Sequence, residues 1–149
     1  MHLKQKVYAA CLQLVDSKIQ SFQNTLNDLG EGAKNDSKSS AGDKHETARA
    51  MMQLEQEKIS RQLDETLAQR EVLQKMDVTV KSIRIQNGSF IKTNSGYLFL
   101  SVALGKVNVD GKDVIVLSAA SPLGKKLMGL EVNAFAEINT TKYIIEEIY

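Results

Sequence analysis

The chain has 149 residues, of which 42% are hydrophobic, and a formal net charge of +1. This apolar content is enough for one globular core plus an elongated part, and the near-neutral charge excludes nucleic-acid binding through a strong basic field. A single cysteine excludes an internal disulfide, and no apolar run approaches the roughly 18 residues of a membrane span. We therefore expect a cytoplasmic protein with no membrane partner.

The first 29 residues are predicted to form an amphipathic helix. Apolar residues recur at a spacing of three to five and mark one stripe: Leu3, Val7, Cys11, Leu14, Ile19, Phe22, Leu26 and Leu29. Within that stripe Cys11 is interpreted as a small core residue. Gly30 is expected to end the helix, and the following "GEGAKNDSKSSAG" (30–42) is predicted to be a polar loop.

A second helical pattern runs from about Asp43 to Met76. Its composition strongly favours helix, and its stripe consists of Ala48, Met52, Ile59, Leu63, Leu67, Leu73 and Met76. Since neither stripe is stable in water alone, the two helices are predicted to cover each other as an antiparallel coiled-coil hairpin over residues 1–77, with its tip at about 31–46. Such arms are roughly 40 to 50 Å long. The alternatives are a bundle folded back on the rest of the chain and a dimerisation coiled coil.

Residues 78–149 change to a strand pattern. The predicted strands are "VTVKSIRI", "SFIKT", "GYLFLSVALGKV", "DVIVLS", "AFAEI" and "KYIIEEI", separated by turns that contain glycine or asparagine. One short helix is predicted in "SPLGKKLMGLE", where Ser121 precedes Pro122 and Gly129 stops the helix. The fold class is therefore α+β: a helical hairpin followed by an antiparallel sheet of four to six strands with one short helix.

Two motifs resemble a known family. Gly42, Asp43, Glu46 and Ala48 match G-D-x-x-E-x-A at the start of the second helix. The second motif, S-P-[IL]-x-x-x-L-[IM]-G, is matched by Ser121, Pro122, Leu123, Leu127, Met128 and Gly129. In this order and spacing the chain resembles the bacterial transcript cleavage factors GreA and GreB. The resemblance implies a coiled-coil hairpin at residues 1–77 and, at 78–149, a domain similar to FK506-binding proteins.

The resemblance also implies a function. The hairpin would enter the secondary channel of RNA polymerase, where Asp43 and Glu46 would help to hold the polymerase's second Mg²⁺ and position a water near the nascent RNA 3′ end. The chain would be a monomeric accessory factor that binds no metal by itself, because the polymerase would cleave its own backtracked transcript. Candidate contacts with RNA or polymerase are Lys38, Lys44 and Arg49. Candidate docking residues are Ser121, Pro122, Leu123, Leu127 and Gly129.

The residue types of the acidic pair support a magnesium role, but alternatives stay open. Two carboxylates three residues apart share a helix face, and their hard oxygen atoms suit magnesium. However, Asp43 as an N-cap with Glu46 at the third helical position would explain the same pair, and so would capping of Ser40 with Asp43. Leu54 occupies the register where the family has a basic residue. A regulator that occupies the channel without promoting cleavage therefore stays open, as does a coiled-coil adaptor unrelated to transcription.

Overall fold

The computed structural model describes residues 2–36 and 42–149, with the side chains of residues 32–45 left out. Two long helices, α1 (His2–Asp36) and α2 (Gly42–Lys75), precede the strands. The chain forms two compact units, which we describe separately. The helical unit is Leu14–Arg70, and the sheet unit combines Met1–Gln13 with Glu71–Tyr149.

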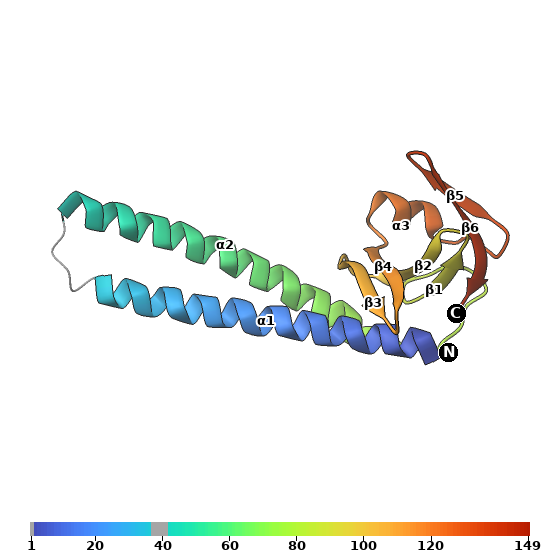
Figure 1. Cartoon of the computed structure of the whole chain (residues 1–149), viewed down its shortest axis with the longest axis horizontal. Helices are drawn as coiled ribbons and strands as arrows, with labels where there is room; N and C mark the ends of the chain where they lie inside the picture. The colour runs from blue at the N-terminus through green and yellow to red at the C-terminus, as the bar shows by residue number, and fades with distance from the viewer. Residues whose placement is uncertain (1, 37–41) are drawn as a thin grey trace. The chain divides into compact units, whose positions relative to one another are not determined.

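In the helical unit, α1 and α2 run antiparallel (Figure 1). Arg70 Nε donates to Asp16 Oδ1 over 2.6 Å and so ties the two helices together. The buried residues of this unit include Val15, Ile59 and Thr66, and the Thr66 hydroxyl donates to the Gln62 carbonyl of its own helix. The two predicted helices are therefore confirmed, although the packed seam contains a threonine as well as aliphatic side chains.

Helix α1 does not end at Gly30, as the sequence pattern predicts, but continues to Asp36. Gly30 is not among the residues with positive φ, so it does not form the left-handed cap that commonly stops a helix. A glycine within a helix costs only about 1 kcal/mol relative to alanine, and the neighbouring turns can compensate for it. Of the predicted loop 30–42, residues 37–41 lie outside the described part of the chain.

The sheet unit contains six strands in the order β3-β4-β2-β1-β6-β5. Their bounds are β1 Phe90–Thr93, β2 Gly96–Ser101, β3 Gly105–Val109, β4 Lys112–Ser118, β5 Phe135–Ile138 and β6 Thr141–Ile148. Four pairings are antiparallel, but β2 and β4 are parallel, so the expectation of a wholly antiparallel sheet is wrong. The cause is the hairpin of β3 and β4, which places β3 outside β4 at the sheet edge and lets β4 run beside β2.

Two predicted strands differ in the structure. The run "GYLFLSVALGKV" divides into β2 and β3 around residues 102–104. The segment "VTVKSIRI" (78–85) is not a strand, because only Ile85 of its aliphatic residues is buried and this residue bonds to the chain after the short helix. Ile85 N–H donates to the Leu130 carbonyl over 2.9 Å, and its carbonyl accepts from Gly129 N–H over 2.8 Å. Residues 78–85 thus form an irregular connection to β1.

The core of the sheet unit lies between one face of the sheet and α3 (Pro122–Leu127). It consists of Ile85, Ile91, Leu98, Leu100, Leu117, Leu127, Ala136, Ile145 and Ile148. The base of α1 belongs to the same unit, and Lys4 Nζ donates to the Val80 carbonyl over 2.9 Å. The α+β class with two long helices, a sheet and one short helix is confirmed.

Candidate functional site at the start of the second helix

The predicted acidic pair lies at the N-terminal end of α2. Because α2 begins at Gly42, Asp43 and Glu46 both belong to this helix and are three positions apart, which is the spacing of residues on one helix face. The Glu46 side chain is exposed and makes no ion pair with any side chain that the structure describes. The side chains of Asp43 and Lys44, and the whole of Lys38, lie outside the described residues.

Both capping alternatives fall on residues outside the described part of the chain. The first depends on the side chain of Asp43 and on the residues before Gly42. The second capping register depends on Ser40, which lies outside the described residues.

The chemistry available to Glu46 is that of a solvated carboxylate. Within residues 2–36 and 42–149, with side chains 32–45 left out, no group of three or more His, Cys, Asp and Glu residues could hold a metal ion. A magnesium ion that retains waters and also binds phosphate needs only one or two protein carboxylates. An exposed glutamate at a helix start, with an aspartate three positions earlier, fits this limited demand.

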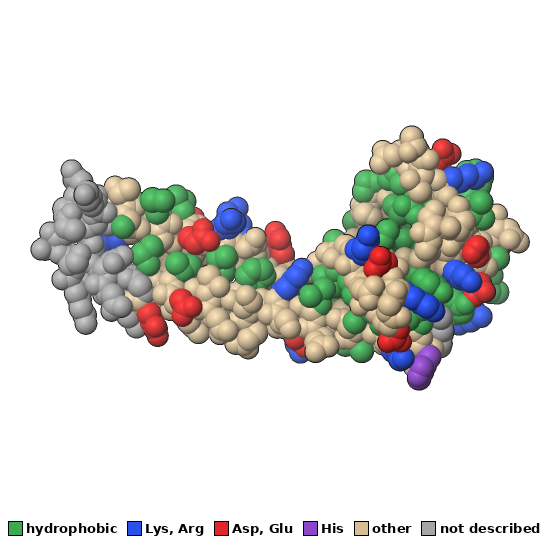
Figure 2. All heavy atoms as spheres, in the orientation of Figure 1, with side chains coloured by type: hydrophobic (Ala, Val, Ile, Leu, Met, Phe, Trp, Pro, Cys, Tyr) green, Lys and Arg blue, Asp and Glu red, His purple; other side chains and the backbone are tan. Residues whose placement is uncertain are grey.

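The residues that follow Glu46 on α2 are exposed and of mixed character. Arg49 is exposed, as the candidate contact with RNA or polymerase requires. Leu54 and Met51 have 65% and 66% of their surface exposed, so they do not serve the seam between the helices. Figure 2 shows hydrophobic side chains at the surface of the helical unit among acidic and basic ones. Among the described side chains on this face, no strongly basic stripe for an RNA backbone is visible.

The second motif mainly stabilises the short helix α3. Ser121 is its N-cap: the side-chain oxygen accepts from Gly124 N–H over 3.0 Å and donates to the Ser118 carbonyl over 2.6 Å. Leu127 is fully buried in the core, and Leu123 is half-buried against it. Leu127 therefore has no surface with which to contact a partner in this structure.

The two remaining docking candidates are exposed at the surface. Pro122 occupies the first position of α3, where its missing N–H costs no hydrogen bond. Gly129 has φ of +83°, and its N–H bonds to the Ile85 carbonyl. Docking at these two positions, and at the half-buried Ser121 and Leu123, stays a prediction.

Gly124 is a residue whose role the sequence motif did not reveal. A Cβ atom at this position would overlap the Ser118 carbonyl oxygen and lie 2.9 Å from Ala119 Cα. The first turn of α3 thus packs directly against the backbone at the end of β4. The motif positions matched in the sequence skip this glycine, although a glycine inside a predicted helix is itself a signal of close packing.

No protein-family model matches the sequence, and no curated protein sequence matches it. Among solved structures, the chain is similar to the crystal structure of GreA factor homolog 1 (Gfh1) protein of Thermus thermophilus. The identity is 14%, the match covers 93% of this chain and 94% of that chain, and the TM-score is 0.37.

None of the described helices is both long enough and apolar enough to cross a membrane.

Proposed function

We propose that this protein is a Gre-type transcription elongation factor that binds RNA polymerase through its secondary channel in the cytoplasm. It stimulates the polymerase's own magnesium-dependent cleavage of backtracked RNA and is an accessory factor without a complete active site. The observation that carries the proposal is the exposed Glu46, three helical positions after Asp43. Glu46 is neither buried nor ion-paired with a described residue, so the fold gives no reason for an acid at this position.

The length of α2 supports this proposal. Within the helical unit, about 24 residues of continuous helix separate Glu46 from Arg70, which is roughly 36 Å. The Arg70–Asp16 ion pair ties α2 to α1 near one end of this stretch, and the motif lies at the other. A paired helix of this length can present a carboxylate well inside a protein channel.

The proposed chemistry assigns a limited role to each acid. Asp43 and Glu46 would supply oxygen ligands to a magnesium ion held jointly with polymerase and RNA phosphate, and they would orient a water by hydrogen bonding. A bound divalent ion activates such a water and stabilises the leaving oxygen of a phosphodiester. Arg49, which is exposed one turn further along α2, would contact the transcript.

A second candidate function is supported by Leu54. This exposed leucine stands where the family has a basic residue, so one contact that would hold the RNA is replaced by an apolar side chain. A factor that occupies the channel without promoting cleavage would tolerate this change. In that case the two acids would be dispensable.

The test uses a stalled, backtracked elongation complex in magnesium. We expect the wild-type protein to speed the release of short 3′ RNA fragments, and Asp43→Asn and Glu46→Gln to slow this release by at least about tenfold, in the range seen when metal-site residues are removed. Glu55→Gln is the matched control, since it removes an exposed acid elsewhere on α2. Binding is measured by competition with the labelled wild type.

The outcomes separate the two candidates. If Asp43→Asn and Glu46→Gln bind and stimulate cleavage like the wild type, the magnesium role is wrong. If the wild type binds polymerase but neither it nor any variant promotes cleavage, the protein is a non-cleaving regulator. Failure of the wild type to bind polymerase would refute both.

A further inference from the structure

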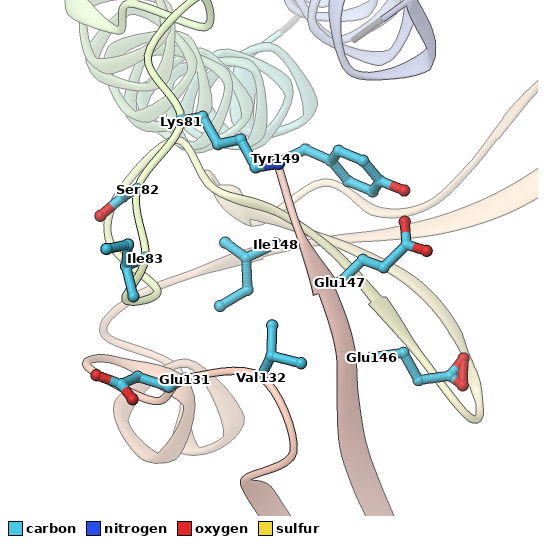
Figure 3. Close-up of a pocket in the computed structure, with 9 residues that line it drawn as sticks. All are labelled: Lys81, Ser82, Ile83, Glu131, Val132, Glu146, Glu147, Ile148 and Tyr149. Carbon is cyan, nitrogen blue, oxygen red and sulfur yellow. The ribbon is translucent and has the colours of Figure 1, made fainter.

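The sheet unit contains a groove beside the end of β6. It has a volume of about 540 Å³ and is formed by residues 81–83, 131–132 and 146–149 (Figure 3). Its walls are the irregular connection before β1 and the chain that follows α3. None of the motifs recognised in the sequence includes these residues.

The floor of the groove is aliphatic. Ile83, Val132 and Ile148 line it, and Figure 3 shows Val132 and Ile148 on one side of β6 with Ile83 on the loop across from them. Ile83 has 82% of its surface exposed and Val132 has 44%, whereas Ile148 is buried. Exposed aliphatic side chains that gather in a concave site are typical of a binding surface, because covering them removes apolar area from water.

The backbone of β6 is unpaired on its side facing the groove. Phe90 and Tyr149 exchange two hydrogen bonds of 3.1 and 2.7 Å, so they are a hydrogen-bonded pair of the antiparallel ladder. The N–H and C=O of the preceding residue, Ile148, must then point away from β1. Among the residues that the structure describes, these two groups have no backbone hydrogen-bond partner.

The same edge of β6 is hydrogen-bonded three residues earlier, at Ile145. Ile145 N–H donates to the Ala134 carbonyl over 2.9 Å, and the Ile145 carbonyl accepts from Asn133 N–H over 2.8 Å. The pairing of β5 with β6 ends at Phe135 and Ile144. The edge therefore opens between Ile145 and the end of β6, where the groove lies.

Two of the residues that line the groove, Glu146 and Glu147, are acidic. Figure 3 shows Glu146 and Glu147 on the side of the strand away from Ile148. Glu147 lies opposite Lys92 in the sheet register, and Glu146 has no ion pair with any described residue. The cations near the groove are already engaged. Arg84 pairs with Glu131 over 3.2 Å, and Lys81 lies over the Tyr149 ring.

We propose that this groove binds an extended segment of a partner polypeptide in which aliphatic and basic residues alternate. The segment adds beside β6 and pairs with the N–H and C=O of Ile148. Side chains of an added strand alternate between the two faces, so aliphatic residues pack on Ile83 and Val132 while basic residues face Glu146 and Glu147. This site is independent of the tip carboxylates and of their proposed function.

The test is an NMR titration of the full chain with a short, end-blocked peptide in which lysine and valine alternate. We expect shifts of the backbone amides of Ile148, Ile83 and Val132. Ile83→Thr should weaken binding about tenfold, because a hydroxyl replaces the ethyl branch that the peptide would cover. Ile115→Thr is the matched control, since it makes the same change at another exposed isoleucine of the sheet unit, and it should leave the affinity unchanged.

Two further peptides test the mode of binding. An N-methylated peptide cannot pair with a strand edge and should not bind, and a peptide alternating glutamate and valine should bind more weakly than the lysine peptide. Equal binding of the N-methylated peptide, or shifts confined to β3 or β5, would overturn the proposal. So would a dimer in sedimentation that Ile83→Thr abolishes, because the occupant would then be a second copy of this chain.

Discussion

The sheet unit and the helical unit each contain one of the two motifs that resemble the Gre family, but the side chains of the two motifs lie in different surroundings. In the sheet unit, the roles of Ser121, Gly124 and Leu127 in the fold are evident: one caps α3, one allows close approach to β4 and one fills the core. In the helical unit, Glu46 is exposed and makes no ion pair with a described residue. A motif that the fold already explains is weak evidence for function. In the other motif only Glu46 of the acidic pair has a described side chain, and its role stays a prediction.

The largest effect should come from a glycine in the sheet unit. Gly124→Ala places a Cβ against the Ser118 carbonyl oxygen, so the backbone of α3 must move away from β4. We expect a loss of about 3 kcal/mol in the free energy of unfolding, within the range for overpacking a buried site. Chemical denaturation followed by near-UV absorption of the sheet tyrosines measures this loss.

Gly30→Ala in α1 is the matched control. A Cβ at Gly30 meets no atom within 4 Å, and the glycine lies within a helix. This variant should gain up to about 1 kcal/mol, because alanine favours helix over glycine. If both variants lost similar stability, the contrast between a constrained and an unconstrained glycine would be wrong.

The element types of the fold were largely predictable because hydrophobic spacing determines them. Both long helices, the short helix after Ser121 and five segments containing the strands follow from local patterns. The parallel pairing of β2 with β4 depends on which side of β4 the strand β3 occupies, and no local pattern records that. The segment 78–85 alternates like a strand but lacks a ladder partner, so tertiary context decided its conformation.

The candidate site was only partly predictable. Spacing alone placed Asp43 and Glu46 on one helix, but whether they cap it depends on the residue where α2 begins. The motif also suggested Leu127 as a docking residue, although burial commits this side chain to the core. Conversely, the groove beside β6 is assembled from three distant segments, and none of them has a distinctive sequence.

The second expected effect concerns Cys11, in the part of α1 that belongs to the sheet unit. Burial raises the pKa of its thiol to about 11. The folded state therefore binds more protons than the unfolded state between about pH 9 and 11, so stability is lost as the pH rises through this window. At about pH 10 this loss should reach about 1.4 kcal/mol.

Cys11→Ala provides the reference for this measurement. The variant should be less stable than the wild type at neutral pH, but its free energy of unfolding should fall less between about pH 8 and 10. The native wild-type thiol should also react very slowly with a disulfide reagent near neutral pH, because it is buried and protonated. Parallel pH dependence in both proteins, together with fast labelling, would mean that the base of α1 is loosely packed.

The smallest expected effect concerns the hydroxyl hydrogen bonds of two serines in the sheet unit, Ser101 and Ser118. Ser101 is 5% exposed, and its hydroxyl has no hydrogen-bond partner among the described residues. By contrast, the hydroxyl oxygen of the neighbouring Ser118 accepts a hydrogen bond from Ala120 N–H over 3.1 Å. Ser101→Ala should therefore stabilise the protein by about 1 kcal/mol, because it removes an unsatisfied buried polar group. Ser118→Ala removes a bond and should destabilise by about the same amount. Thermal unfolding of both variants decides the signs, and a loss of stability in Ser101→Ala would show that a bound water already satisfies this hydroxyl.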